Sequence, residues 1–218
     1  MATQTKENYL KALYYLHQKD AAISITNLGK EMEVSKPTVN DMVKKLQVMG
    51  WVKYEKYKPL YLTKQGLKQA SNIIRKHRLS ELFLSNIMGF GWEEVHAIAE
   101  DMEHLKSESF FDRVDELLGY PKNDPHGSPI PDKNGKIESI TYIPLAKVQA
   151  GKKVVLKALR DSSAEFIKYL NRKEIKLGAV LKVDQIEPFD NSRIVSYKKH
   201  SKELLSYAVC NQLLVVEE

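Results

Sequence analysis

Apolar and polar positions alternate with a helical period over the first fifty residues. Apolar side chains recur three or four positions apart in residues 5–18 and again in residues 25–32, which is the pattern of helices that bury one face. A third helix is predicted from Ser35, a good N-cap, through Pro37 in the first turn to about Met49. The chain therefore opens with three predicted helices.

A strand pattern replaces the helical one after Gly50, which ends the third helix. Residues 51–55 and 60–62 alternate apolar and polar side chains on either side of a turn at Pro59, as the two strands of a β-ribbon do. Three helices followed by a ribbon predict a winged helix-turn-helix, and we place this DNA-binding domain at residues 1–63.

The middle of the chain has a helical pattern and ends in a proline-rich stretch. Helices are predicted over residues 63–86, 92–105 and 107–118. Glycines near position 89 separate the first two, and four of the eight prolines fall within residues 119–142, which indicates a linker. We assign residues 64–142 to a helical domain that ends in this linker.

Beyond residue 143 the apolar residues come in short runs typical of strands. These runs are residues 154–156, 180–183, 193–197 and 213–216, and a helix is predicted over residues 164–170. Short strands with a single helix predict a small β-barrel over residues 143–218. The fold class predicted for the whole chain is therefore α+β.

The composition excludes several classes of protein. Among the 218 residues there is no apolar run of the roughly 18 residues that span a membrane, and the N-terminal residues lack the apolar core of a secretory signal. Cys210 is the only cysteine, which excludes a disulfide framework and an all-thiolate zinc site. We expect a cytoplasmic protein with no membrane partner. The formal net charge of +6 favours an anionic partner without identifying it.

Positive charge and small polar side chains gather around the predicted third helix. Six lysines and two acidic residues lie between positions 36 and 58, a balance that suits a phosphate backbone. Small polar side chains in the first turns of such a helix can reach base edges in the major groove. The candidate DNA-binding residues are Ser35, Lys36, Pro37, Thr38, Asn40, Lys44, Lys45 and Lys53. The alternative is a solvated lysine face on a helix that only packs, and the surrounding helix-turn-helix and wing disfavour it.

Histidines and carboxylates recur on one face of the helix predicted over residues 92–105. His96, Glu100, Glu103 and His104 are spaced i, i+4, i+7 and i+8, so their side chains project from the same side. Imidazole and carboxylate ligands suit manganese(II), iron(II) or cobalt(II) better than metals that prefer thiolates.

A second pair, His77 and Glu81, is spaced i, i+4 on the preceding helix. If the two helices fold back about Gly89, this pair comes level with Glu100 and His96. No lysine or arginine on this face balances the carboxylates, so we expect a cation between the helices. Exposed ion pairs are the alternative, but those normally alternate in sign along a helix.

Six short motifs spread over nearly the whole chain carry a family resemblance. They are Glu7-Asn8-Tyr9-Leu10, Val34-Ser35-Lys36-Pro37-Thr38-Val39, Leu60-Tyr61-Leu62-Thr63-Lys64-Gln65-Gly66, Arg75-Lys76-His77-Arg78-Leu79-Ser80-Glu81, Met102-Glu103-His104 and Pro125-His126-Gly127-Ser128-Pro129-Ile130-Pro131. Together they resemble the diphtheria-toxin-repressor family, which includes iron-dependent regulators and manganese transport regulators. The resemblance implies a winged helix, a helical dimerisation and metal-binding domain, and a C-terminal SH3-like barrel.

The resemblance also implies two metal sites in each subunit, filled by Mn(II) or Fe(II). The primary site, which activates DNA binding, would be made by Glu100, Glu103, His104 and, from the first helix, Asn8. The ancillary site would be made by His77, Glu81 and His96. Further candidates are Asp124 and His126, by resemblance to streptococcal members, and Asp161 and Glu165 near the barrel helix. For these last four residues, a polar side chain that faces solvent and binds no metal is an equally open interpretation.

Three positions depart from the family pattern. Glu100 replaces the cysteine typical of the iron-dependent branch, and this hard oxygen ligand favours manganese. Asn8 replaces the aspartate of the manganese regulators and the methionine of the iron branch. Lys11 stands where the manganese regulators have a ligating glutamate. A protonated lysine cannot ligate, which argues against a paired manganese site that uses both first-helix positions.

The predicted function is a DNA-binding transcriptional repressor of metal-uptake genes, active when Mn(II) or Fe(II) is bound. Such a protein is not an enzyme and has no small organic substrate. We expect a homodimer that reads a pseudo-palindrome, with its seam over residues 107–118, where apolar side chains exceed what one thin domain can bury.

Two other functions remain as alternatives. The first is a metal-dependent hydrolase or a di-iron carboxylate enzyme, although only residues 100–104 resemble the Glu-x-x-His segments that a di-iron bundle needs twice. The second is a metal-independent DNA-binding regulator in which the cluster is vestigial.

Overall fold

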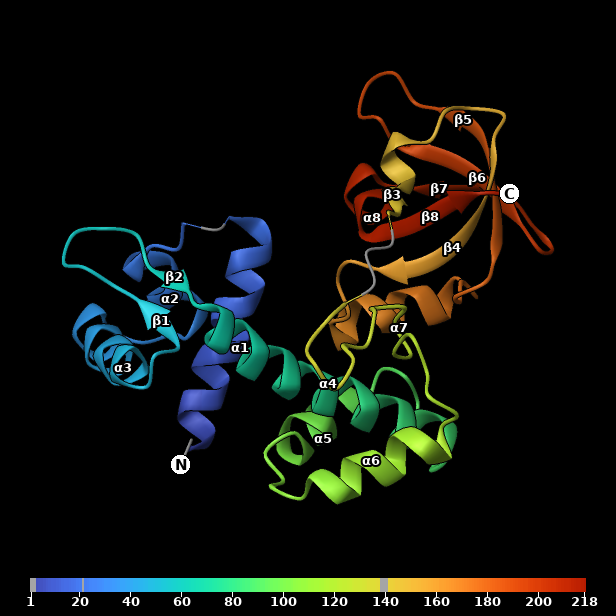
Figure 1. The fold of residues 1–218 in the computed structure, drawn as a ribbon. Coiled ribbons are helices and arrows are strands. Elements are labelled where there is room, and N and C mark those ends of the chain that lie inside the picture. The colour runs from blue at the N-terminus through green and yellow to red at the C-terminus, as the bar shows by residue number, and fades with distance from the viewer. Residues whose placement is uncertain (1–2, 21, 138–140) are drawn as a thin grey trace. The chain divides into compact units, whose positions relative to one another are not determined.

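The computed structural model describes residues 3–20, 22–137 and 141–218 (Figure 1). The chain divides into two compact units. The first comprises Met1–Ser80, Ile98–Tyr120 and Ile130–Glu138, and the second comprises Glu81–Ala97, Pro121–Pro129 and Ser139–Glu218.

Three helices and a ribbon open the first unit. They are α1 (Gln4–Lys19), α2 (Ile25–Glu31), α3 (Lys36–Val48), β1 (Val52–Lys53) and β2 (Tyr61–Leu62), and the two strands pair antiparallel. Ser35 caps α3 by accepting the N–H of Thr38. The apolar faces of the helices close over one core that includes Leu13, Leu28 and Val43. The predicted order of three helices and a ribbon is confirmed.

The strands of the ribbon are shorter than predicted, because only two residues of each strand pair. The Tyr54 carbonyl accepts the side-chain amide of Gln47 at 2.9 Å rather than an N–H from the opposite strand, and Pro59 has no N–H to donate. Gly66 lies so close to the ribbon that an added Cβ would be 1.9 Å from the carbonyl oxygen of Trp51. Only glycine fits at that position.

The middle helices are α4 (Lys64–Asn86), α5 (Val95–Met102) and α6 (Glu108–Leu117). The helix predicted over residues 92–105 is therefore too long at both ends. A helix would offer the Trp92 carbonyl to the N–H of His96, but this carbonyl instead accepts a hydrogen bond from the His126 imidazole at 2.8 Å. At the other end, Glu103 and His104 lie in a turn after α5.

The predicted linker has no helix in its described part, residues 119–137, but it is partly packed. Asp124 and His126 are buried in the second unit, and Ile130 is buried in the first. Gly127 adopts a φ of +86°, and an added Cβ there would lie 2.1 Å from the Lys157 carbonyl oxygen. The prolines and glycines therefore shape tight turns that place particular side chains, rather than a loose connection.

An antiparallel sheet forms most of the second unit. Its strands are β3 (Ile143–Pro144), β4 (Lys153–Leu159), β5 (Val180–Ile186), β6 (Arg193–Tyr197), β7 (His200–Leu205) and β8 (Leu213–Glu217), in the spatial order β3-β8-β4-β5-β6-β7. The short helices are η1 (Leu145–Lys147), α7 (Ala164–Arg172) and α8 (Tyr207–Gln212). The fold class is α+β, as predicted.

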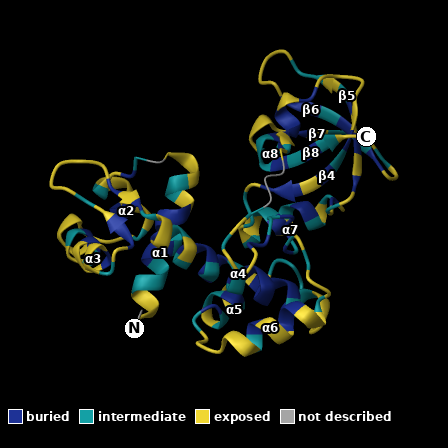
Figure 2. Cartoon of the chain, in the orientation of Figure 1, coloured by how far each residue is buried: buried dark blue, intermediate teal, exposed yellow. Residues whose placement is uncertain are grey.

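The sheet of the second unit is not a closed barrel. Among the described strands no pairing joins β3 to β7, so the predicted closure is not found. The sequence did not predict β7, because its side chains are mostly polar and it pairs only with β6. Buried residues follow the inner faces of the strands (Figure 2). No described helix has the length and apolar character needed to cross a membrane.

Candidate functional site

Two carboxylates and an ammonium group form a cluster in the first unit. The Lys11 Nζ on α1 lies 2.6 Å from Glu100 Oε2 on α5 and 2.9 Å from Glu103 Oε2 just after α5. His77 of α4 joins them, with its Nδ1 2.7 Å from Glu103 Oε2. The Glu103 side chain is 0% exposed. Side chains from three helices therefore meet at one buried carboxylate.

The cation expected between the carboxylates is, in this structure, a side chain of the protein. Neither α4 nor α5 presents a balancing lysine on this face, but α1 supplies Lys11. The predicted face of α5 itself carries no lysine or arginine, and the positive charge between the carboxylates comes from α1. Burial lowers the pKa of Lys11, but the charge of Glu103 and the hydrogen bonds to both carboxylates outweigh it and raise the pKa above its usual value.

His104 and Asn8 add two further potential ligands. His104 Nδ1 lies 2.6 Å from Glu7 Oε2, and its Nε2 lies 3.8 Å from Glu103 Oε1. If Nδ1–H donates to Glu7, the Nε2 lone pair faces the carboxylate cluster. Within the described chain, Asn8 Oδ1 is buried without a hydrogen-bond partner. Such an oxygen is costly to bury unless something binds it.

These donors fit a hard divalent cation. Carboxylate and amide oxygens with imidazole nitrogen are the ligands that manganese(II) and iron(II) accept. The only cysteine, Cys210, is buried in the core of the second unit, so no thiolate is offered here. The unpartnered Asn8 oxygen is the observation that points to a ligand.

A second cluster of ligand-type side chains lies in the second unit. Glu81, Asp124 and His126 are all buried, and one candidate ligand atom of each lies within 4.8 Å of the others. His126 donates its Nε2–H to the Trp92 carbonyl at 2.8 Å, which leaves Nδ1 facing Glu81 Oε2 at 3.8 Å. A hydrogen bond from the second ring nitrogen is the usual way to orient a metal-binding histidine.

The carboxylate of Asp124 is held by its own turn. Its Oδ1 accepts the backbone N–H of His126 at 2.8 Å and that of Ser128 at 2.9 Å. Burial lowers the pKa of His126, but the hydrogen bond to Glu81 and the charges of Glu81 and Asp124 raise it above its usual value. The sequence around position 124 therefore fixes two ligand candidates on one tight turn.

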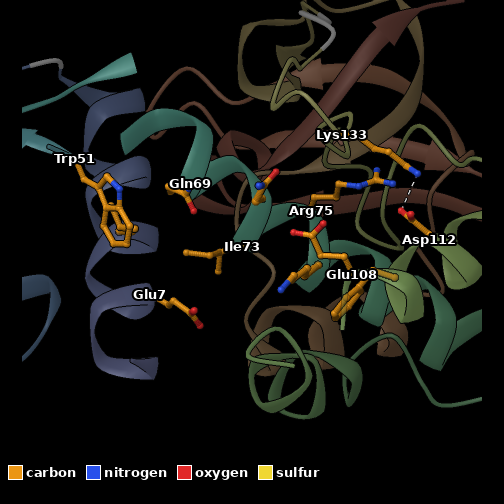
Figure 3. A pocket seen from close by; sticks show the side chains of 12 residues that line it. Glu7, Trp51, Gln69, Ile73, Arg75, Glu108, Asp112 and Lys133 are labelled. Atoms are coloured by element: carbon orange, nitrogen blue, oxygen red, sulfur yellow. Dashed lines mark ion pairs between the residues drawn. The ribbon is translucent and has the colours of Figure 1, made fainter. Parts of the chain in front are cut away.

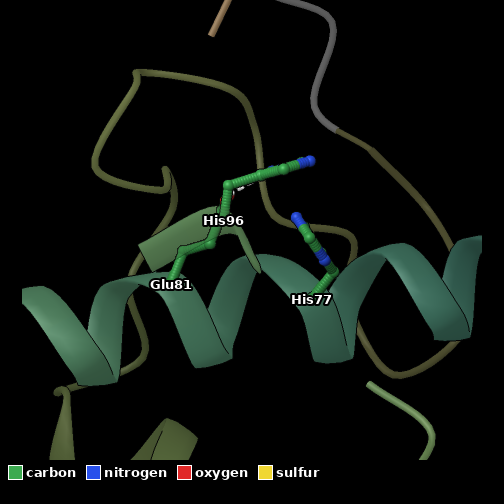
Figure 4. Close-up of side chains that lie close together, drawn as sticks. All are labelled: His77, Glu81 and His96. Atoms are coloured by element: carbon green, nitrogen blue, oxygen red, sulfur yellow. Dashed lines mark hydrogen bonds and ion pairs between the residues drawn. The ribbon is translucent and has the colours of Figure 1, made fainter. Parts of the chain in front are cut away.

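His96 and His77 are the remaining histidines of the predicted ancillary site. His96 Nδ1 lies 3.1 Å from Glu81 Oε1, and its side chain is 56% exposed. His77 precedes Glu81 by one turn of α4, and Figure 4 shows both side chains leaving the helix on the same side. The predicted fold-back is found, because Glu81 meets His96 and His77 groups with Glu100.

Asp161 and Glu165 lie outside both clusters. Asp161 Oδ1 accepts the Ser163 N–H at 2.8 Å just before α7, and Glu165 is exposed in the first turn of that helix. A carboxylate near a helix N-terminus is stabilised there without any metal. Sequence reasoning also missed Glu7, although it belongs to the same four-residue motif as Asn8.

A cavity of about 210 Å³ lies in the first unit and is lined by Glu7 together with residues of α4 and α6 (Figure 3). Charged side chains in its wall already pair with one another or with their neighbours. Arg75 lies 2.6 Å from Asp115, and Lys133 lies 2.8 Å from Asp112. We therefore assign no ligand to this cavity.

The candidate DNA-binding residues occupy α3 and the ribbon. All are exposed except Asn40, which is half-buried; the exposed ones are Ser35, Lys36, Pro37, Thr38, Lys44, Lys45 and Lys53. The Tyr54 hydroxyl donates to Asn40 Oδ1 at 2.8 Å. The Ser35 and Thr38 hydroxyls lie 2.9 Å apart.

The expected seam on α6 exposes less apolar surface than the sequence indicated. Phe111 and Val114 are buried within the unit, and Phe110 and Leu118 are half-buried. Leu117 remains 57% exposed. The reason is that α6 packs its apolar face inward, where the Phe110 and Phe111 rings meet edge to face at 5.2 Å.

Three family models match successive parts of the chain. Residues 1–60 match the model for the N-terminal DNA-binding domain of iron-dependent repressors, and residues 63–132 match the model for their metal-binding and dimerisation domain. Residues 143–217 match the FeoA domain model. The iron-dependent repressor IdeR of Mycobacterium leprae is 31% identical over 77% of this chain and 77% of its own length. The chain belongs to the iron-dependent repressor family.

Solved structures of repressors share the fold along nearly the whole chain. The manganese regulator SloR is 33% identical with a TM-score of 0.77, and the alignment covers 98% of each chain. A manganese-dependent transcriptional repressor in complex with manganese is 28% identical with a TM-score of 0.86, covering 98% of this chain and 100% of that one. IdeR and the manganese-bound protein are named repressors, and SloR is named a regulator.

Proposed function

We propose that this repressor binds operator DNA as a homodimer and that manganese(II) or iron(II) activates it. The observations that carry the proposal are the cluster of Glu100, Glu103 and His104 and the unpartnered oxygen of Asn8, which lies on α1, the same helix that supplies Lys11 to the cluster. This cluster joins α1, which packs with α3 in one core, to the helices α4 and α5. Its occupancy therefore acts on the helix that supports the reading head.

Glu100, Glu103, His104 and Asn8 would hold the primary ion. When bound, the ion supplies the charge that draws two carboxylates and an amide oxygen together. Glu7 orients His104 by accepting its Nδ1–H, and His77 contacts the buried oxygen of Glu103. Lys11 holds both carboxylates before the ion arrives, and its ammonium must then withdraw or share them.

The second cluster is our candidate for the ancillary ion. Glu81, Asp124 and His126 would hold it, with His96 at the exposed side. His77, on α4, contacts Glu103 and so belongs with the first cluster. Asp161 and Glu165 remain weaker candidates, since both are accounted for by the start of α7.

Manganese(II) is the metal that this donor set favours over iron(II). Glu100 gives the primary site a hard oxygen where a cysteine would give a soft sulfur. SloR is named a manganese regulator, which supports the same choice. The genes under control would be those of metal uptake.

The reading head would use α3 in the major groove and the ribbon as its wing. Lys36, Lys44, Lys45 and Lys53 would contact phosphates, and Ser35, Pro37, Thr38 and Asn40 would meet the base edges. Two copies of the chain would pair through α6, with Leu117 at the seam. We propose the domain limits 1–63, 64–142 and 143–218, an SH3-like C-terminal domain and the cytoplasm as the place of action.

The test is a titration of metal against labelled DNA. A duplex is selected from a random library by the full-length protein loaded with manganese, and its binding is then measured in chelated buffer with added Mn²⁺, Fe²⁺ or Zn²⁺. We expect Mn²⁺ and Fe²⁺ to tighten binding by about 100-fold, within the roughly 5- to 150-fold range that is usual for coupling between two binding sites. Equal binding with and without metal would support a metal-independent regulator instead.

A further inference from the structure

We propose that Tyr54, in the wing, is a positioning residue for sequence reading by α3. Its hydroxyl holds the side chain of Asn40 and so decides which base groups Asn40 can contact. This inference rests on the proposed function, because it requires α3 to lie in the major groove. Tyr54 would not be found by listing the residues that contact DNA, because it acts through Asn40.

The contact links two elements that DNA would meet together. The Tyr54 hydroxyl donates to Asn40 Oδ1 at 2.8 Å, across 14 positions of sequence. Asn40 lies in the second turn of α3, and Tyr54 directly follows β1. Both residues are half-buried, so the bond is shielded from water on part of its surface and yet borders the exposed face of α3.

Tyr54 is itself anchored, so it can hold Asn40 in place. Its side chain packs against the core of the first unit. Its backbone carbonyl accepts the Gln47 side-chain amide at 2.9 Å, which ties it to the far end of α3. Its ring, its backbone carbonyl and its hydroxyl group therefore all hold Tyr54 in place. Little side-chain entropy is then lost when DNA binds.

The hydrogen bond changes what Asn40 can read. A free asparagine amide pairs with adenine through both its oxygen and its nitrogen. Here the Tyr54 hydroxyl engages the oxygen, while no protein acceptor is found for the Asn40 Nδ2 within the described residues. The amide is left to donate, which suits acceptors in the major groove such as guanine O6 and N7 or thymine O4. The amide oxygen keeps a second lone pair, but Tyr54 fixes the plane of the amide, so Asn40 should pair with adenine only where that plane matches the base and should otherwise contact these acceptors.

The test compares Tyr54→Phe with Tyr57→Phe in the full chain. Tyr57 lies in the same loop of the wing and is 91% exposed, so its variant controls for loss of a hydroxyl in the wing. The duplex selected by manganese-loaded wild type, every single-base substitution of it and a scrambled duplex are titrated with each variant.

We expect Tyr54→Phe to weaken binding to the selected duplex by about three- to tenfold, the worth of one oriented hydrogen bond. Binding to scrambled DNA should stay unchanged. The differences in affinity among the four bases should shrink at the same positions as in Asn40→Ala. Duplexes with adenine at these positions should bind relatively better than they do to wild type. Tyr57→Phe should behave as wild type.

A double variant separates positioning from folding. In the Asn40→Ala background, Tyr54→Phe should have no further effect on the profile, because the residue it positions is gone. Equal weakening on both duplexes, or a full additional loss in the double variant, would overturn the proposal and leave Tyr54 a structural residue. Failure of the proposed function is visible separately, because the wild type would then bind without metal or select no sequence.

Discussion

The two clusters of carboxylates and imidazoles differ in how the chain assembles them. In the first, Lys11, His77 and Glu103 come from three separate parts of the sequence and meet only when α1 packs beside α4 and α5. In the second, Asp124 and His126 sit on one turn and are tied by a backbone hydrogen bond of 2.8 Å. The first cluster therefore depends on how three helices pack. In the second, one local turn already positions two of the residues, Asp124 and His126.

The charge balance differs as well. Lys11 is a permanent cation already within 2.6 Å of a candidate ligand, so an arriving ion must compete with an ammonium group. In the second cluster the groups that contact the carboxylates include imidazoles and backbone N–H donors. The ammonium group of Lys11 can therefore set the metal concentration at which the first cluster fills, whereas in the second cluster one turn already positions Asp124 and His126. Four substitutions test this, beginning with the largest effect.

Glu103→Ala should abolish metal-activated operator binding. Its carboxylate is 0% exposed and contacts Lys11, His77 and His104, so its loss removes a ligand and leaves a buried ammonium with one partner fewer. We expect the ratio of operator affinities with and without manganese to fall by about 100-fold or more. The free energy of unfolding should fall by about 3 kcal/mol. DNA titration and urea unfolding measure the two effects.

Asp101→Ala is the matched control for that variant. Asp101 is an exposed acidic residue two positions away, and its loss should change neither measurement. If Glu103→Ala retained the full manganese response, the first cluster would not be the activating site.

Lys11→Met should bind manganese about tenfold more tightly than wild type, which corresponds to about 1.4 kcal/mol. The reason is that the ion no longer competes with an ammonium for the carboxylates. The same variant should be less stable without metal, because Glu100 and Glu103 then repel each other, so the gap between the melting temperatures with and without manganese should widen.

Isothermal titration and thermal unfolding measure both quantities, with Lys19→Met, exposed at the end of the same helix, as the control. Weaker metal binding by Lys11→Met would show instead that the ammonium holds the carboxylates in place for the ion.

Asp124→Ala should remove the ancillary ion while leaving the primary one. Its carboxylate belongs to the second cluster alone, so we expect the number of tightly bound manganese ions per chain to fall by one and operator affinity to fall only a few-fold, on the order of 1 kcal/mol. Manganese paramagnetic resonance counts the ions. Loss of both ions would mean that the clusters are one cooperative site.

Glu165→Gln should have the smallest effect. The side chain is exposed at the start of α7 and belongs to neither cluster, so ion number and operator affinity should stay within about twofold of wild type, as for most surface substitutions. A loss comparable to that of Asp124→Ala would extend the second cluster to α7.

The sequence by itself determined the local structure and which helices carry the candidate ligands. Caps such as Ser35 and Ser107 and the apolar periods specified where helices form, because capping and one-sided burial depend on neighbours within a turn or two. The i, i+4 spacings and the bend near Gly89 are also local features of the sequence, and they predicted that Glu81 would lie level with His96.

Only the tertiary structure decided what those helices meet. The approach of α1 put Lys11 between Glu100 and Glu103, the His126 imidazole took the Trp92 carbonyl and shortened α5, and the wing placed Tyr54 on Asn40. The sheet of the second unit stayed open between β3 and β7 because closure depends on which edges meet. Each of these joins residues far apart in the sequence, and their pairing depends on how whole elements pack, which no local pattern records.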